Sequence, residues 1–212
     1  MRFLTYLLDA LFPPRETDLL VRAEQLSFLL EKMRVTLCMR GGLLFASPFL
    51  YRDKRIEALM LESKFHNNKK AHMLLGQTLR VCILQLHSRW FPDSREIVLV
   101  PVPLSSRRRR ERGYNQVEKI GRFAVTDELG HIAIHQNPTI LRRIRHTKPQ
   151  TSLSAQERRR NVRDAFSARP ADETYLYIVF DDVCSTGATL FAAEKALREA
   201  GARQIYVISL AH

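Results

Sequence analysis

The stretch IVFDDVCSTGATL, residues 178–190, joins two adjacent carboxylates to a run of small and hydroxyl-bearing residues. Asp181 and Asp182 end an apolar run typical of a buried strand, where two like charges repel and suggest a ligand. The residues that follow offer hydroxyls and backbone N–H groups to an anion at the start of a helix. Carboxylates repel a phosphate group, but they accept hydrogen bonds from hydroxyls or bind a phosphate-bound Mg²⁺. The combination therefore predicts a site for a sugar phosphate.

A simpler interpretation is a strand followed by an N-capped helix, with Asp182 or Thr186 as the capping residue. That interpretation accounts for one acid and one hydroxyl, and it leaves the rest of the run unexplained. The chain contains neither GxGxxG nor GxxxxGK[ST], so a dinucleotide site and a P-loop site have no support.

The elements around this stretch predict an α/β fold. IVLVPVP, residues 97–103, is a continuous apolar run typical of a strand covered on both faces, with its prolines at the exit. Residues 175–180, 189–201 and 204–211 read as strand, helix and strand, a unit that implies a parallel sheet. Ligands bind at the carboxyl ends of the strands in such a sheet, and the two acids follow one of those ends.

The remaining elements are mostly helical by the spacing of their apolar residues. Helices are expected over residues 17–37, 53–65, 71–90 and 115–129. Residues 131–137 and 139–144 are expected to form either a strand or a hairpin pair.

The net charge of +12 is concentrated in two windows of the 212-residue chain. Residues 107–122 hold seven Lys/Arg against two Glu, a net of +5, and residues 142–163 hold eight against one, a net of +7. The rest of the chain is therefore balanced. Such windows favour an anionic partner, either the phosphates of a small ligand or a nucleic-acid backbone. The alternative is a solvated face.

Three cysteines, Cys38, Cys82 and Cys184, are too widely spaced for a zinc pattern and argue against a disulfide framework. The opening stretch, residues 1–14, reads as a short amphipathic helix stopped by two prolines and not as a targeting signal. Nothing later reaches a membrane-spanning length of apolar residues. We therefore expect no membrane insertion and a cytoplasmic location.

The sequence also resembles a known family. VFDDVCSTGATL, residues 179–190, resembles the phosphoribosyl pyrophosphate (PRPP) binding motif of type I phosphoribosyltransferases. Together with PVPLSSRRRRERGYNQ (101–116) and RRIRHTKPQTSLSAQERRRNVRDAF (142–166), it is similar to the ComF/GntX family of competence-associated, phosphoribosyltransferase-like proteins. The resemblance extends back to about residue 48.

The resemblance implies a type I phosphoribosyltransferase-like parallel sheet flanked by helices, over residues 48–212. Residues 142–166 correspond to a mobile hood that excludes water from the site, and residues 181–189 to the PRPP loop. Many family members begin with a four-cysteine zinc module, whereas this chain has only Cys38 in that region. Residues 1–47 are therefore expected to be a degenerate, mostly helical segment, and no zinc is predicted.

The resemblance also assigns roles. Asp181 and Asp182 would hold the ribose hydroxyls and stabilise the positive charge of an oxocarbenium-like transition state. Magnesium would arrive with PRPP, so no protein-bound metal is predicted. The residues that would cradle the 5′-phosphate are Ser185, Thr186, Gly187, Ala188 and Thr189. Ser185 stands where the family more often has threonine and keeps the hydroxyl.

Two further sets of residues follow from the basic blocks. The candidates for contact with pyrophosphate, in its loop or in the hood, are Arg112, Gly113, Asn115, Gln116, Arg143, Lys148 and Arg160. The candidates for contact with single-stranded DNA are Arg107, Arg108, Arg109 and Arg110, which are too many for one small ligand. Tyr114 is open to two interpretations, a base-stacking residue or part of the core.

Two hypotheses remain open. The first is a Mg²⁺-dependent phosphoribosyltransferase that acts on an acceptor the sequence does not identify. The second is a non-catalytic competence factor that keeps the nucleotide pocket and binds single-stranded DNA beside DNA-uptake proteins.

Overall fold

The computed structural model describes residues 14–129, 132–144 and 165–212. Their main feature is a seven-stranded sheet with the strand order β1-β2-β9-β8-β3-β5-β4, and a separate two-stranded ribbon pairs β6 with β7. The strands of the large sheet are β1 (Thr36–Arg40), β2 (Leu43–Ser47), β3 (Glu96–Pro101), β4 (Thr126–Leu129), β5 (Ile132–Gln136), β8 (Leu176–Val183) and β9 (Gln204–Ala211). The ribbon consists of β6 (Leu141–Arg143) and β7 (Phe166–Ala168).

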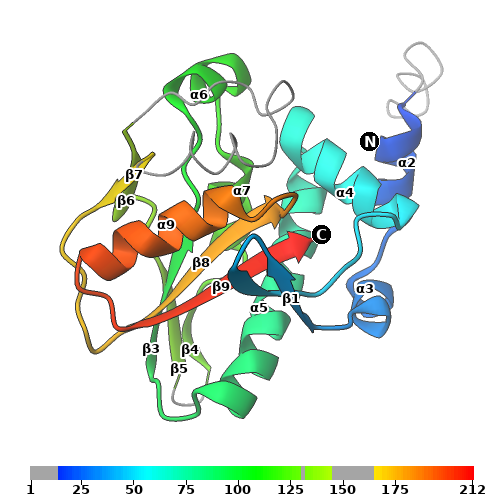
Figure 1. Cartoon of the computed structure of the whole chain (residues 1–212). Coiled ribbons are helices and arrows are strands. Elements are labelled where there is room, and N and C mark those ends of the chain that lie inside the picture. The colour runs from blue at the N-terminus through cyan, green and yellow to red at the C-terminus, as the bar shows by residue number, and fades with distance from the viewer. Residues whose placement is uncertain (1–13, 130–131, 145–164) are drawn as a thin grey trace.

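The helices lie on both faces of the sheet (Figure 1). They are α2 (Glu16–Ala23), α3 (Leu26–Lys32), α4 (Lys54–Phe65), α5 (Lys69–Trp90), α6 (Ser106–Arg112), α7 (Gln116–Arg122) and α9 (Ala188–Glu199). Neighbours from β2 to β5 run parallel, while β1 and β4 are antiparallel at the two edges. This confirms the predicted α/β fold with a mainly parallel sheet between helices.

Alternation along the central strands builds two hydrophobic cores. Ile97 and Leu99 of β3 face a core that includes residues of α3, α4, α5 and α7, whereas Val98 and Val100 face a core shared with α9 and the β6–β7 ribbon. Because successive side chains of a strand point to opposite faces, a strand covered on both sides needs an unbroken apolar run. The run over residues 97–103 predicted this correctly.

The region from residue 17 to residue 37 is not one helix. α2 ends at Ala23, α3 ends at Lys32, and β1 begins at Thr36, with Glu24 and Gln25 extended between the helices. Gly41 and Gly42 have φ values of 60° and 85°, so they form the turn that folds β1 back onto β2. The helical prediction was wrong because strand pairing with β2, not local apolar spacing, decides the conformation of residues 36–40.

The expected helix over residues 115–129 is also shorter. The Arg80 guanidinium donates hydrogen bonds to the carbonyls of Phe123, Ala124 and Val125 at 2.7, 3.2 and 3.0 Å. It therefore supplies hydrogen-bond donors to the backbone carbonyls that follow the end of α7. The following residues form β4. The predicted strands over 131–137 and 139–144 exist as β5 and β6, but they do not pair as a hairpin: β5 pairs with β3 and β4, and β6 pairs with β7.

The N-terminal part of the described chain joins the main body. β2 lies within the predicted N-terminal segment and pairs in parallel with β9, and α2 packs on α4 through the ion pair of Arg15 with Glu62. The domain boundary at residue 47 remains a prediction. Each helix of the described residues is too short or too polar to cross a membrane.

Candidate functional site

A cavity of about 900 Å³ opens at the carboxyl ends of β3 and β8. These two strands are neighbours in the sheet, but the chain leaves them in opposite directions: β3 leads through α7 on one face, and β8 leads through α9 on the other. A crevice forms where connections diverge in this way, and ligands of open α/β sheets bind there. The lining residues are Lys64, residues 102–105, Arg107, Arg108, Arg110, Glu111, Arg112, Gln116, Arg143 and residues 181–190.

Asp182 is held in place at the floor of this cavity. Its Oδ2 accepts a hydrogen bond of 2.7 Å from Nε2 of the buried Gln116, and its Oδ1 accepts one of 2.8 Å from the Val183 backbone. Gln116 in turn accepts a hydrogen bond from the Arg112 guanidinium. A chain of hydrogen bonds therefore runs from Arg112 through Gln116 to Asp182, and it links residues 112–116, the RGYNQ segment, to the acid pair.

The Asp181 carboxylate lies in surroundings that disfavour its charge. Burial raises the pKa of Asp181 well above its usual value, and the neighbouring charge of Asp182 raises it further. Lys64, at the end of α4, opposes this rise in pKa. An acid with this surrounding is stabilised by any group that brings hydroxyl donors or positive charge into the cavity.

The loop after the acids is shaped for close approach. Gly187 has a φ of 77°, and a Cβ atom at this position would lie 2.8 Å from the carbonyl oxygen of Arg40. Only glycine both adopts a positive φ without strain and leaves room for the Arg40 carbonyl. The Arg40 guanidinium also donates a 3.0 Å hydrogen bond to the Ser185 carbonyl, so the β1–β2 hairpin buttresses the loop. α9 then begins at Ala188. Gly187 at its N-cap has no side chain, and the Thr186 hydroxyl accepts a long hydrogen bond of 3.5 Å from the Ala188 backbone, as the simpler capping interpretation allowed for Thr186.

All the predicted phosphate-loop residues line the cavity together with both acids. The helix N-terminus of α9 presents its first N–H groups on the same side, where they favour an anion. The sequence prediction that acids and loop act on one ligand therefore has a consistent geometry.

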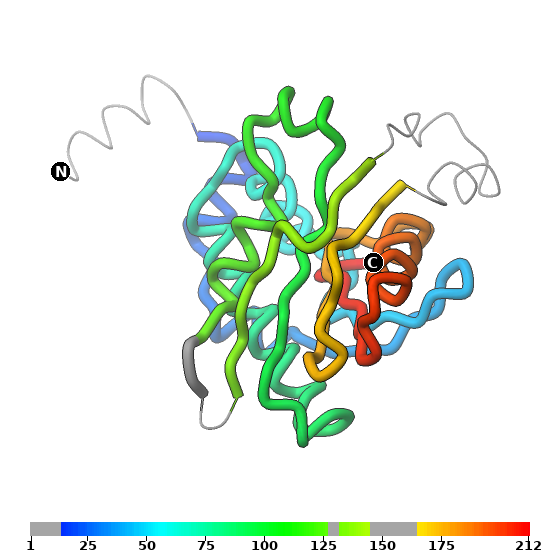
Figure 2. Tube along the Cα trace, turned by 90° about the vertical axis from the view of Figure 1, so that its left-hand side faces the viewer, coloured from blue at the N-terminus to red at the C-terminus, as the bar shows by residue number. Residues whose placement is uncertain are grey.

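The hood candidates are only partly described. Arg143, in β6, lines the cavity, and its guanidinium carbon lies 5.3 Å from the Phe166 ring centre of the paired strand β7. Burial lowers the pKa of Arg143, and Arg108 lowers it further. β6 and β7 leave the body side by side (Figure 2). Lys148 and Arg160 lie outside the described residues.

The arginine run forms helix α6, none of whose residues is buried. Ser105 caps this helix by accepting a 3.3 Å hydrogen bond from the Arg108 backbone. Arg107, Arg108 and Arg110 line the cavity, so they reach the ligand site as well as the surface. Arg109 points elsewhere and pairs with Glu118 at 3.1 Å.

Two predicted pyrophosphate contacts have structural roles. Gly113 ends α6 with a φ of 79° and does not line the cavity. Asn115 is buried and caps α7: its Oδ1 accepts from Val117, and its Nδ2 donates to the Val102 carbonyl at 3.1 Å. A ligand contact by either residue stays a prediction.

Tyr114 acts as a strut. Its hydroxyl donates to the Ser63 carbonyl at 3.0 Å and accepts from the Asn67 backbone at 2.8 Å. These bonds tie the start of α7 to the end of α4 and support the structural interpretation of this tyrosine.

Sequence reasoning missed Lys64, Ser105 and Arg40. Lys64 and Ser105 line the cavity, and Arg40 supports the phosphate loop from below. Ser105 lay within the quoted basic block and was detectable as a helix cap. Lys64 and Arg40 carry no motif, because long-range packing alone brings them to the site.

The oxygen donors suit a hard cation. Asp181 and Asp182 supply carboxylates of the type that Mg²⁺ prefers. Among residues 14–129, 132–144 and 165–212 no group of three or more His, Cys, Asp or Glu side chains is arranged to hold a metal. A bound Mg²⁺ would therefore take most of its ligands from phosphate oxygens and water. The predicted absence of zinc is not tested.

Comparison with known proteins places these features in a family. The chain is 31% identical over 163 residues to Competence protein F of Haemophilus influenzae, which covers 74% of this chain and 67% of that protein. It is 32% identical over 110 residues to DNA utilization protein YhgH of Salmonella typhi and of Salmonella typhimurium, which covers 51% of this chain and 46% of theirs. No family model matches the chain. On the match to Competence protein F, the chain belongs to the ComF family.

Proposed function

We propose that this protein binds PRPP or a related ribose 5-phosphate, together with Mg²⁺, in the cavity at the end of β8. One observation carries the proposal: both acids and the entire phosphate loop line the same cavity, at the point where α9 begins. The acids accept hydrogen bonds from sugar hydroxyls, and the loop and the helix N-terminus hold the 5′-phosphate. The cations that face the remaining space, Lys64 and Arg112, suit a pyrophosphate.

A catalytic role follows from the same arrangement. Loss of pyrophosphate from the anomeric carbon leaves positive charge on the sugar, which the acid pair would stabilise. Magnesium, when bound, would neutralise the leaving pyrophosphate. Gln116 holds Asp182 at one orientation, so that carboxylate needs little reorganisation during the reaction. The names of the relatives support a place for this activity in competence or DNA uptake.

Calorimetry with PRPP, with and without Mg²⁺, tests the binding site. Wild type should bind PRPP more tightly with Mg²⁺, and the double variant Asp181→Asn/Asp182→Asn should lose most of that affinity. Glu57→Gln, on α4, removes one carboxylate away from the cavity lining and serves as the control for charge. Unchanged affinity in the double variant would exclude this pocket. Release of pyrophosphate with a panel of nucleobases and amines then tests catalysis.

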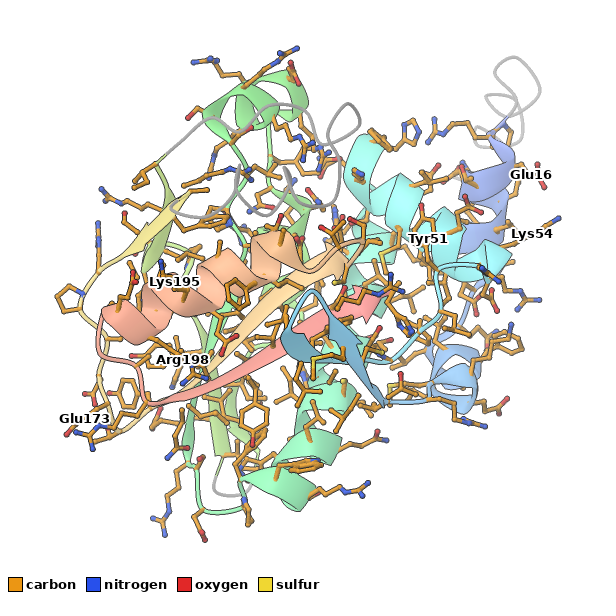
Figure 3. All side chains as sticks on the ribbon, viewed as in Figure 1. Glu16, Tyr51, Lys54, Glu173, Lys195 and Arg198 are labelled. Carbon is orange, nitrogen blue, oxygen red and sulfur yellow. The ribbon has the colours of Figure 1, made fainter. Side chains whose placement is uncertain are left out.

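A second candidate function is binding of single-stranded DNA along α6. It is favoured by the exposure of Arg107 to Arg110 on α6, a helix of which four arginines, Arg107, Arg108, Arg110 and Arg112, also line the cavity. Affinity for a phosphate backbone should fall steeply as salt rises. Figure 3 shows other basic residues, such as Lys54 and Lys195, on different surfaces of the protein.

Those residues provide a charge-matched control. Replacement of Arg107 to Arg110 with alanine should weaken binding of a dT oligonucleotide and flatten its salt dependence. A control that replaces Lys54, Lys69, Lys195 and Arg203 removes the same charge elsewhere and should have a smaller effect. Equal losses in the two variants would indicate non-specific attraction, and no loss in the first would exclude α6.

A further inference from the structure

An exposed aromatic ring lies beside two residues that line the cavity, although it does not line the cavity itself. Phe65 is the last residue of α4, and 56% of its surface is exposed, whereas Ile56, Leu59 and Met60 of the same helix are buried. Burying a phenylalanine side chain normally stabilises a protein by about 1.5 to 3 kcal/mol, so an exposed ring forgoes that gain. Its place next to the cavity-lining Lys64 suggests that the ring has a partner.

Two cations lie against the ring. The Lys64 ammonium is 5.2 Å and the Arg112 guanidinium carbon 5.6 Å from the ring centre. Both residues line the cavity and both interact electrostatically with the acid pair: Lys64 with Asp181, and Arg112 with both carboxylates. Lys64 and Arg112 therefore each interact both with the Phe65 ring and with the acid pair.

The end of α4 is fixed where Phe65 stands. Tyr114 accepts from the Asn67 backbone and donates to the Ser63 carbonyl, so it holds the residues on both sides of Phe65. Lys119 donates to the Asn67 side chain as well. Asn67 has a φ of 51°, the left-handed conformation that asparagine adopts more readily than most residues and that commonly ends a helix. The turn after Phe65 is thus locked by the RGYNQ segment, which also orients Asp182.

We propose that Phe65 is the stacking platform for a nucleobase whose ribose or deoxyribose phosphate occupies the cavity. Stacking on an aromatic side chain accepts any base, because every base has a π-face, and an adjacent guanidinium adds a cation–π contribution. Lys64 and Arg112 would then serve two groups at once, the ring and the phosphates. The inference rests on the proposed function, since it adds a base site to the ribose phosphate site.

The base has two sources, a free nucleotide or the end of a single strand, and the same ring serves both. Four probes separate them: ribose 5-phosphate, AMP, a 5′-phosphorylated dT oligonucleotide, and an oligonucleotide of equal length with abasic sites. In wild type, AMP should bind more tightly than ribose 5-phosphate if nucleotides are accepted. The dT strand should bind more tightly than the abasic strand if DNA is accepted.

Phe65→Ala should remove the advantage conferred by the base, a loss of about 5- to 100-fold. It should leave ribose 5-phosphate and PRPP binding within about twofold of wild type, because those ligands carry no base. Trp90→Ala is a matched control: Trp90 is 47% exposed, ends α5, and has the Arg89 guanidinium 5.6 Å from its ring, but Arg89, unlike Lys64 and Arg112, does not line the cavity. Trp90→Ala should leave the affinities for all four probes unchanged.

A third variant tests the stacking itself. Trp90 is the one tryptophan of the chain, so Phe65→Trp in a Trp90→Phe background places a single indole at position 65. This variant should regain the tighter binding of the ligands that carry a base, and those ligands should quench the indole fluorescence. Ribose 5-phosphate, which has no base, should not quench it.

The outcomes distinguish the two proposals. Wild type that binds PRPP but gains nothing from a base, with Phe65→Ala unchanged, overturns the platform and leaves the ribose phosphate site intact. Wild type that binds none of the probes overturns both. A Phe65→Ala variant that loses PRPP as well assigns Phe65 to the shape of the sugar-phosphate site and overturns the platform.

Discussion

Glu62 and the Asp181–Asp182 pair are acids with opposite surroundings: Glu62 and Asp182 are buried, and Asp181 is partly buried. The Glu62 side chain has no exposed surface and accepts two hydrogen bonds of 3.0 Å from Arg15 and one of 2.7 Å from Thr17. Asp181 and Asp182, at the end of β8, are adjacent carboxylates, and Gln116 donates the hydrogen bond that holds Asp182. Glu62 is paired with a cation inside the fold, whereas Asp182 accepts hydrogen bonds from the uncharged Gln116 side chain and the Val183 backbone, and Asp181 accepts one from the Asp182 backbone.

The pKa directions express this difference. Burial alone would raise the pKa of Glu62, but the hydrogen bonds from Arg15, Thr17 and Asn68 outweigh it and hold the pKa below its usual value. For Asp181, burial and the adjacent Asp182 act together and raise the pKa. A lowered pKa means that the ionised acid stabilises the fold, and a raised pKa means that ionisation of the acid costs stability.

The largest effect should come from Glu62. Glu62→Ala should destabilise the protein by about 2 to 4 kcal/mol, because it removes the buried acceptor that joins α2 to α4. Urea unfolding at neutral pH measures this change. Glu57→Ala on the same helix is the control and should cost less than about 1 kcal/mol. Equal losses of unfolding free energy in Glu62→Ala and Glu57→Ala would show that the buried hydrogen bonds of Glu62 add no stability.

Asp181→Asn should have the opposite sign. It removes a poorly solvated charge and the repulsion of Asp182, so the ligand-free protein should become more stable by about 1 kcal/mol at neutral pH. The same variant should bind PRPP more weakly, which separates function from stability. Destabilisation in urea unfolding would show that Asp181 contributes to the fold.

The two acids should also respond oppositely to pH. Glu62 has a lowered folded pKa, so its stabilisation is present above its unfolded pKa and is lost as pH falls through the folded value. Asp181 has a raised folded pKa, so the cost of its charge is absent in acid and grows as pH rises from the unfolded to the folded value. Unfolding free energies from pH 3 to pH 8 should therefore show the Glu62→Ala gap narrowing in acid. The Asp181→Asn gap has the opposite sign, because this variant is more stable than wild type at neutral pH, and it should also narrow in acid, where Asp181 of the wild type is neutral.

Gln116 should give the smallest effect. Gln116→Ala frees Asp182 from its 2.7 Å hydrogen bond and breaks the link to Arg112, so PRPP affinity should fall about threefold to tenfold. Gln204→Ala, at the start of β9, is the control and should leave affinity unchanged. Full affinity in Gln116→Ala would show that Asp182 needs no orienting donor.

Much of the site was predictable because it is local. The acids, the small-residue loop and the following helix are consecutive, and backbone geometry alone places them at one end of a strand. The same locality explains why residues 97–103 and the β8–α9–β9 unit were predicted correctly. The helix–strand boundaries at residues 36 and 123 were not, because Arg80 and the β1–β2 pairing act on them from distant positions.

The sequence by itself determined the α/β class, the acid pair with its phosphate loop, and the concentration of charge in two basic windows. Tertiary structure decided what surrounds the acids. It brought Lys64 and Arg112 to the cavity, made Asn115 and Tyr114 into structural supports, and left Phe65 exposed next to Lys64 and Arg112. The physical reason is that a strand and its loop obey short-range rules, whereas electrostatics and burial depend on elements that meet only when the chain has folded.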